Sequence, residues 1–132
     1  MNRPHLLLRY LWALPVTVIG LALALPARAW GARATVVDGV LEVGGEPIRA
    51  VVARLPSVMR FSAITLGHVI LGVDTHALAR CRAHEQVHVR QYERWGILFF
   101  PLYFGSSALQ FIRGRNPYWD NHFERQARDR SR

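Results

Sequence analysis

The chain begins with an apolar segment, residues 6–25, whose only charged residue is Arg9. Its uncharged part, residues 10–25, is somewhat shorter than the roughly 20 residues that a membrane-spanning helix needs. Residues 27–29 read Ala-Arg-Ala, which also fits the cleavage site of a signal peptide. We therefore expect residues 1–29 to form an uncleaved membrane anchor. The alternatives are a signal peptide of a secreted or periplasmic protein, and a buried core helix.

Apolar positions follow a strand-like pattern between residues 34 and 71. A β-branched run surrounds Asp38-Gly39, a pair typical of a type I′ hairpin turn. Gly and Pro at residues 44–47 indicate a second turn, and residues 48–53 and 63–71 have the composition of further strands. These segments predict a small antiparallel sheet that precedes the next helix. His68 lies in the last strand, where its side chain faces either a substrate cleft or, as we expect, solvent.

From residue 75 onward the apolar positions have the period of an amphipathic helix. Asp74 or Thr75 is a suitable N-cap, and Gly96 is a suitable end. Cys81, the single cysteine, excludes an intrachain disulfide and is expected to be a small core residue. At about 100° per residue, charged side chains fall on one side, and the opposite side combines apolar residues with two histidines and a glutamate. This inner side consists of Leu78, Cys81, His84, Glu85, His88, Tyr92 and Trp95.

The same helix carries the pattern His84-Glu85-x-x-His88. Residues four apart in a helix lie on one face, so both imidazoles can bind one metal ion. Glu85 then lies beside a metal-bound water and is the candidate general base, as in zinc hydrolases with this motif. The alternative is that both histidines are hydrogen-bonded core residues and that Glu85 pairs with an arginine. A catalytic zinc site also needs a third protein ligand and an open position for water.

Further downstream, residues 116–121 indicate a turn, and Glu124 lies in the first turn of the helix that follows. The H-E-x-x-H motif with a distal helical glutamate resembles the gluzincin branch of zinc metallopeptidases. This resemblance implies that His84, His88 and Glu124 bind Zn²⁺ and that Glu85 acts as the base. Residues 83–96 are also similar to a stretch in a group of short bacterial membrane proteins, which continue with an N-P-F-E-x-x-A segment.

Alternatives remain for the third ligand. His122 stands where that group of membrane proteins has proline, so it is a rival ligand or a donor that supports the ligands. Glu124 has two simpler roles, a capping box with Asn121 and an i,i+4 ion pair with Arg128.

The resemblance to zinc peptidases also implies a substrate-binding strand and a group that stabilises an oxyanion. In peptidases of this type, an edge strand just before the motif helix holds an extended substrate by main-chain pairing. The corresponding residues here are Gly67, His68 and Val69. Tyr92, Tyr118 and His122 are the candidates for the oxyanion.

A second apolar segment, residues 96–112, is uncharged and is followed by Arg113 and Arg115. It is too short to span a membrane by roughly a turn or more. A span here would also separate the two motif histidines from Glu124 by about 30 Å. We therefore expect a helix that does not cross the membrane and that is broken near Pro101 and Gly105.

The charge of the chain comes from arginine alone. Its 17 basic residues include no lysine and give a net charge of +8. Because the arginines are spread along the chain, we expect no nucleic-acid partner, and anionic lipid headgroups are a more suitable partner. Residues 125–132 form the only basic cluster, which we interpret as a solvated helix end.

The sequence thus predicts an α+β protein with an N-terminal hydrophobic helix, a small sheet, the motif helix, a broken apolar helix and a C-terminal helix. Residues 30–132 would form a small metallopeptidase-like domain that hydrolyses peptide or protein substrates at a membrane. Two alternatives stay open. One is a non-catalytic membrane protein with a structural metal site or none, and the other is an arginine-rich peripheral protein that acts by charge.

Overall fold

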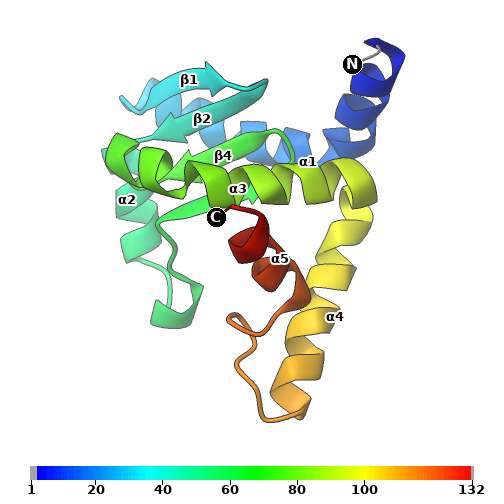
Figure 1. The fold of residues 1–132 in the computed structure, drawn as a ribbon. Helices are drawn as coiled ribbons and strands as arrows, with labels where there is room; N and C mark the ends of the chain where they lie inside the picture. Colours follow the sequence, from blue (N-terminus) through cyan, green and yellow to red (C-terminus); the bar gives the residue numbers. More distant parts are fainter. Residues whose placement is uncertain (1–2, 132) are drawn as a thin grey trace.

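The computed structural model describes residues 3–131 and confirms the α+β class. A four-stranded sheet lies between two long helices, α1 (Arg3–Ala29) behind it and α3 (Thr75–Trp95) in front (Figure 1). Alternation along β4 (Val69–Gly72) explains this arrangement. Val69 and Leu71 belong to the apolar cluster that includes α1, whereas Ile70 packs in the cluster that includes α3.

The sheet has the order β1-β2-β4-β3, with β1 (Arg33–Val37), β2 (Val40–Gly44) and β3 (Ala63–Leu66). Strand pairs β1/β2 and β3/β4 are antiparallel, but β2 and β4 are parallel. The expectation of a purely antiparallel sheet was therefore wrong. The second strand of the β3–β4 hairpin, rather than the first, pairs with β2 and runs in the same direction.

The predicted turn at Asp38-Gly39 is confirmed, whereas the predicted strand at residues 63–71 is divided by a second turn. Asp38 and Gly39 both have positive φ, 51° and 76°, as a type I′ turn requires. Residues 63–71 form two strands because Gly67, with φ 65°, turns the chain back between β3 and β4. An added Cβ at Gly67 would come within 2.6 Å of the Thr17 backbone nitrogen. Glycine is therefore needed for both the turn and the close approach of α1.

This turn also corrects the predicted substrate strand. Gly67 and His68 lie in the turn, and Val69 begins β4, which is an inner strand of the sheet. The edge strand beside the motif helix is β3 instead. His68 is buried rather than exposed because its ring stacks on Tyr10 of α1.

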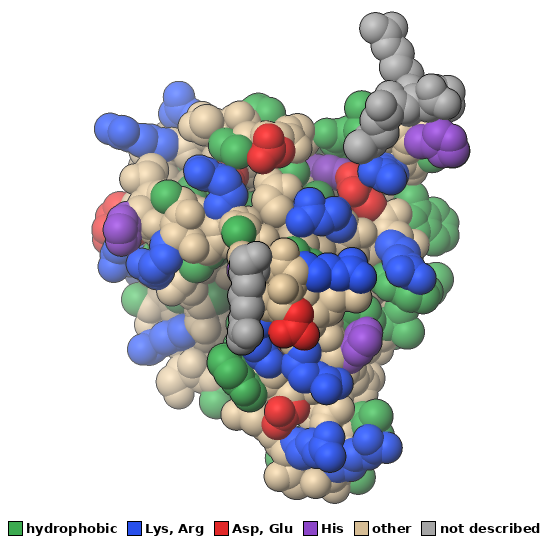
Figure 2. Space-filling model, viewed as in Figure 1, with side chains coloured by type: hydrophobic (Ala, Val, Ile, Leu, Met, Phe, Trp, Pro, Cys, Tyr) green, Lys and Arg blue, Asp and Glu red, His purple; other side chains and the backbone are tan. Residues whose placement is uncertain are grey.

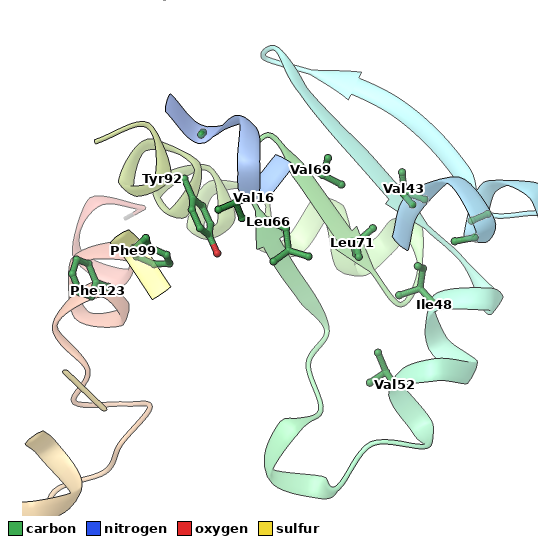
Figure 3. Packing of buried hydrophobic residues seen from close by; sticks show 14 residues of the cluster. Val16, Val43, Ile48, Val52, Leu66, Val69, Leu71, Tyr92, Phe99 and Phe123 are labelled. Carbon is green, nitrogen blue, oxygen red and sulfur yellow. The ribbon is translucent and has the colours of Figure 1, made fainter. Parts of the chain in front are cut away.

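Residues 48–53, predicted as a strand, belong to helix α2 (Glu46–Ala53). Pro47 lies in the first helical turn, where its missing N–H costs nothing and its fixed φ favours the helix. Ile48 and Val52, one turn apart, bury their side chains in the cluster that α1 shares with the sheet (Figure 3). The β-branched composition of the segment is equally compatible with a strand, and the helical spacing of these two residues decides the structure.

Helix α1 packs on the sheet through small residues. Ala13, Val16, Gly20, Ala24 and Ala27 recur at helical spacing, and the four with side chains are buried. Val16 lies close to Leu66 and Val69 in Figure 3. Two helical stretches, His5–Ala29 and Thr75–Ile112, are long and apolar enough to cross a membrane by length and composition.

Helix α3 begins and ends as predicted. The Asp74 side chain accepts a hydrogen bond from the Ala77 N–H at 2.6 Å, and Gly96 ends the helix with φ 58°. A short 3₁₀ turn, η2 (Gly96–Leu98), leads into α4 (Phe99–Ile112). The interruption thus lies at Gly96 rather than near Pro101 and Gly105. Pro101 falls in the first turn of α4, where no backbone donor is required.

Replacing Gly20 by Ala tests the packing of α1. The new Cβ would lie 2.8 Å from the Val69 Cβ and 3.0 Å from the Leu66 carbonyl oxygen. We expect overpacking to cost about 1–3 kcal/mol of unfolding free energy, offset by about 1 kcal/mol of helix propensity. Gly105→Ala in α4 is the matched control because nothing lies within 4 Å of its Cβ position. Urea denaturation should show that Gly105→Ala is the more stable variant. Equal stabilities would contradict this packing of α1.

Candidate metal centre

Three predicted ligands meet where α5 (His122–Arg130) packs against α3. His84 and His88 lie one turn apart on α3, with ring centroids 5.0 Å apart. Glu124 Oε2 lies 3.1 Å from His84 Nε2, and Glu124 Oε1 lies 2.8 Å from His88 Nε2. One donor atom from each residue lies within 4.8 Å of the others. This group can hold a metal ion.

The position of Glu124 depends on Asn121, the fully buried N-cap of α5. Its Oδ1 accepts hydrogen bonds from the Phe123 and Glu124 N–H groups. Its Nδ2 donates to the Tyr103 carbonyl and to Ser107 Oγ, both on α4. The cap therefore fastens the start of α5 to α4, and the chain returns to α3 after α4. In the folded chain α4 therefore does not separate Glu124 from the two histidines.

The Glu124 side chain forms neither a capping box with Asn121 nor an ion pair with Arg128. The Asn121 N–H donates to the Tyr118 carbonyl, so Glu124 does not close a capping box. The Arg128 guanidinium instead stacks on Trp119, 3.7 Å from the ring centroid. His122, the rival ligand, is exposed and its ring packs against Phe123. Among the described residues, Glu124 is the one that joins the histidine pair.

Two supporting groups were not predicted from the sequence. Gln91 Oε1 lies 2.7 Å from His88 Nδ1 and accepts a hydrogen bond from its N–H, which leaves Nε2 directed at Glu124. Gln91 Nε2 in turn donates to the Phe123 carbonyl, so the same side chain connects α3 to α5. Tyr103 donates its hydroxyl to Glu124 Oε1 at 3.0 Å. Partners of this kind orient metal ligands in many sites. The signals in the sequence were a glutamine three residues after His88 and a phenol within an apolar segment.

Glu85 lies beside the ligand group and is itself buried. Thr65, on the edge strand β3, donates its hydroxyl to Glu85 Oε2 at 2.5 Å. Burial raises the pKa of the Glu85 carboxyl, although His88, Thr65 and His84 each act to lower it. Glu85 therefore has the environment of a carboxyl group that holds a proton more readily than usual.

The pKa values of Glu124 and His88 are shifted in the directions that favour their charged forms. Burial by itself would raise the pKa of Glu124, but its contacts with His84 and His88 outweigh burial and lower the pKa. Burial would lower the pKa of His88, yet the Glu124 carboxylate raises it. Without metal, a proton on His88 and a charged Glu124 thus stabilise each other. A metal ion must displace that proton to bind His88 Nε2.

The remaining predicted residues lie outside the ligand group. Tyr92 is buried with its ring against Phe99, and burial raises the pKa of its phenol. Tyr118 is 57% exposed, and its phenol pKa is raised by burial and by the nearby Glu124 carboxylate. His68 Nε2 lies 2.9 Å from Glu93 Oε2, away from the motif histidines. Cys81 is half-buried and is not among the donors of the group.

No family model, curated protein or solved structure matches this chain. The geometry of the site and the chemistry of its residues are therefore the basis for assigning a function.

In the absence of metal, we expect the contact between Glu124 and His88 to stabilise the fold most between pH 4.5 and 6.5, the ordinary pKa values of glutamate and histidine. The lowered pKa of Glu124 contributes stability above pH 4.5, and this is lost as the pH falls. The raised pKa of His88 contributes stability below pH 6.5, and this is lost as the pH rises through the raised value. The raised pKa of Glu85 contributes stability that is lost as the pH rises above 4.5, so the overall maximum should lie toward the acidic end of this range.

Thermal unfolding of chelator-treated protein across this range measures the profile. Glu124→Gln removes the carboxylate that shifts the pKa of His88, so both sides of the profile should become flatter. A profile that Glu124→Gln leaves unchanged would show that the contacts of Glu124 with the histidines do not stabilise the fold.

Proposed function

We propose that this protein is a membrane-associated, zinc-dependent metallopeptidase-like protein that hydrolyses peptide bonds. The observation that carries the proposal is the convergence of Glu124 on the two histidines of an H-E-x-x-H helix. Two imidazoles and one carboxylate are a common ligand set of catalytic zinc, and three protein ligands leave a position for water. The resemblance to gluzincins supports the same assignment.

The donor set fits zinc in size and chemistry. Zinc–nitrogen and zinc–oxygen bonds of about 2.0–2.2 Å separate tetrahedral ligand atoms by roughly 3.4 Å. The donor atoms of His84, His88 and Glu124 already lie within 4.8 Å of one another, so small side-chain rotations suffice. Bound zinc would supply a water molecule with a pKa near 7 and would polarise a substrate carbonyl.

The residues of the chain would manage the protons of the reaction. Glu85 would take a proton from the attacking water on a carboxylate oxygen and pass it to the leaving amine. Thr65 would orient that carboxylate, because its hydroxyl donates to Glu85 Oε2. Gln91 would hold His88 in the tautomer that presents Nε2, and Tyr103 would hold Glu124. Tyr118, half-exposed and close to Glu124, is the best placed of the predicted oxyanion donors.

Membrane association is the second part of the proposal. α1 is uncharged between Arg9 and Arg28, and many of its large apolar side chains are exposed. The net charge of +8 favours a surface of anionic lipids. The packing of α1 on the sheet supports an uncleaved N-terminal helix. Cleavage after Ala29 would remove Ala13, Val16 and Ala24 from the core.

A non-catalytic metal site is the alternative function. The observation that favours it is the environment of Glu85. Its side chain is 7% exposed and accepts a hydrogen bond from Thr65, rather than lying free in an open cleft. In that case the same three ligands would bind zinc only to fasten α5 to α3.

We expect the purified protein to bind one zinc ion per chain. Structural zinc contributes about 10–16 kcal/mol, so the loss of one ligand should weaken binding on the order of 100-fold or more. His84→Ala, His88→Ala and Glu124→Ala should each show this loss in a competition titration with a chromogenic chelator. His122→Ala is the matched control and should bind as the wild type does. Zinc-free wild type, or a loss confined to His122→Ala, would refute the ligand set.

Glu85→Gln separates the catalytic from the structural alternative. The amide can still accept the hydrogen bond from Thr65, but it cannot take a proton from water. We expect zinc binding and unfolding temperature to be kept while hydrolysis of a fluorogenic peptide library falls by about 10²–10⁴-fold. Glu93→Gln, which changes a carboxylate about two turns further along the same helix, where it contacts His68, should keep the activity. Equal hydrolysis by Glu85→Gln and wild type would exclude Glu85 as the base.

A further inference from the structure

The outward side of α1 is apolar from Leu7 to Leu25. Leu7, Leu11, Leu14, Val18 and Leu25 follow one another at helical spacing and are 45–66% exposed. They lie roughly opposite the small residues that pack on the sheet. A helix with one face in the protein core and the other face apolar and uncovered needs a partner that is itself apolar.

Polar bonds fix α1 to the rest of the protein. Tyr10 Oη donates to the Gly39 carbonyl at 2.7 Å, and Trp12 Nε1 donates to the Arg94 carbonyl at 3.1 Å. Thr17 Oγ1 accepts the His68 N–H at 3.0 Å. These partners lie on the β1–β2 turn, at the end of α3 and on the β3–β4 turn. If α1 crossed a bilayer, the sheet would have to enter the hydrocarbon with it or these bonds would break.

The outward side of α4 continues the apolar surface. The Trp12 ring lies against Gly96 of η2, where α1 meets the start of α4. Figure 2 shows hydrophobic side chains gathered along the right-hand edge, over this junction. Phe104, Phe111 and Ile112 are 64–80% exposed. With 14 residues α4 extends only about 21 Å, less than the roughly 30 Å of the hydrocarbon core, before the chain returns through α5.

The groups at the borders of this surface favour lipid over a second copy of the chain. Arg28 lies in the last turn of α1 and Arg33 follows it, and Arg113 and Arg115 follow α4, so cations stand where each apolar helix ends. Trp30, directly after α1, is exposed, as expected for an aromatic side chain at a membrane interface. A second copy would bring a like charge of +8 against the same face.

We infer that this protein is monotopic: α1 lies in the plane of one leaflet of an anionic bilayer, α4 contacts the same leaflet, and neither helix crosses it. The inference rests on the membrane association proposed above and does not depend on zinc or on hydrolysis. Because Tyr103 on the inner side of α4 contacts Glu124, the metal group would lie about one helix diameter, roughly 10 Å, from the lipid.

The two ends of α1 provide the test. In a Cys81→Ala background, His5→Cys and Trp30→Cys place one thiol before and one after the apolar stretch. A membrane-impermeant maleimide is applied to intact spheroplasts that express the full chain, and again after detergent. A monotopic protein gives the same accessibility at both positions and is recovered with the membranes. If only one of the two cysteines reacts before detergent is added, α1 crosses the membrane. A protein recovered without residues 1–29, or recovered in the soluble fraction, would equally overturn the inference.

A charge on the apolar face tests the contact itself. Leu14→Glu should weaken binding to phosphatidylcholine–phosphatidylglycerol vesicles by about 10–100-fold in flotation, since it exchanges a leucine that would contact lipid for a carboxylate. Val58→Glu is the matched control, because Val58 is 92% exposed and lies on neither helix. Both variants should bind zinc as the wild type does, and Glu124→Ala should bind vesicles normally. Equal vesicle binding by Leu14→Glu and wild type would contradict the inference. So would a wild-type protein that is a soluble dimer and does not bind vesicles.

Discussion

The contact of one carboxylate, Glu124, with His84 and His88 is the interaction on which the functional account depends. It joins α3 and α5, two helices that are separated in the sequence by the apolar residues 96–112. The contact exists because α4 is short and because Asn121 fastens the start of α5 to α4. If α4 crossed a bilayer, the ligands would be about 30 Å apart and the motif would have no third partner.

The second constraint is the sandwich of the sheet between α1 and α3. Gly20 and its small neighbours let α1 approach β4, and the opposite face of β4 supports α3 through Ile70. The edge strand β3 then delivers Thr65 to Glu85. The acidic residue of the motif thus contacts the sheet, whereas Glu124 is positioned by its contacts with α4. The candidate base and the third candidate ligand therefore depend on different parts of the fold, which lets variants separate their roles.

Much of the site could be predicted from the sequence, because it depends on local helical geometry. The spacing of His84 and His88, the cap at Asp74 and the type I′ turn are short-range features, and all are present. Features that depend on tertiary packing were missed. Residues 48–53 suit a strand or a helix by composition, and only the burial of Ile48 with Val52 selects the helix. The burial of His68 and the contact of Tyr103 with Glu124 arise from elements distant in sequence, which no local pattern records.

The proposed zinc site consists of two imidazoles and the carboxylate of Glu124. X-ray absorption spectroscopy of the zinc-loaded protein measures the ligand atoms directly. We expect nitrogen and oxygen neighbours at about 2.0–2.2 Å, with the multiple-scattering pattern of two histidines, reduced to one in His88→Ala. A sulfur neighbour at about 2.3 Å, which Cys81 would supply, or a spectrum unchanged in His88→Ala, would contradict this ligand set.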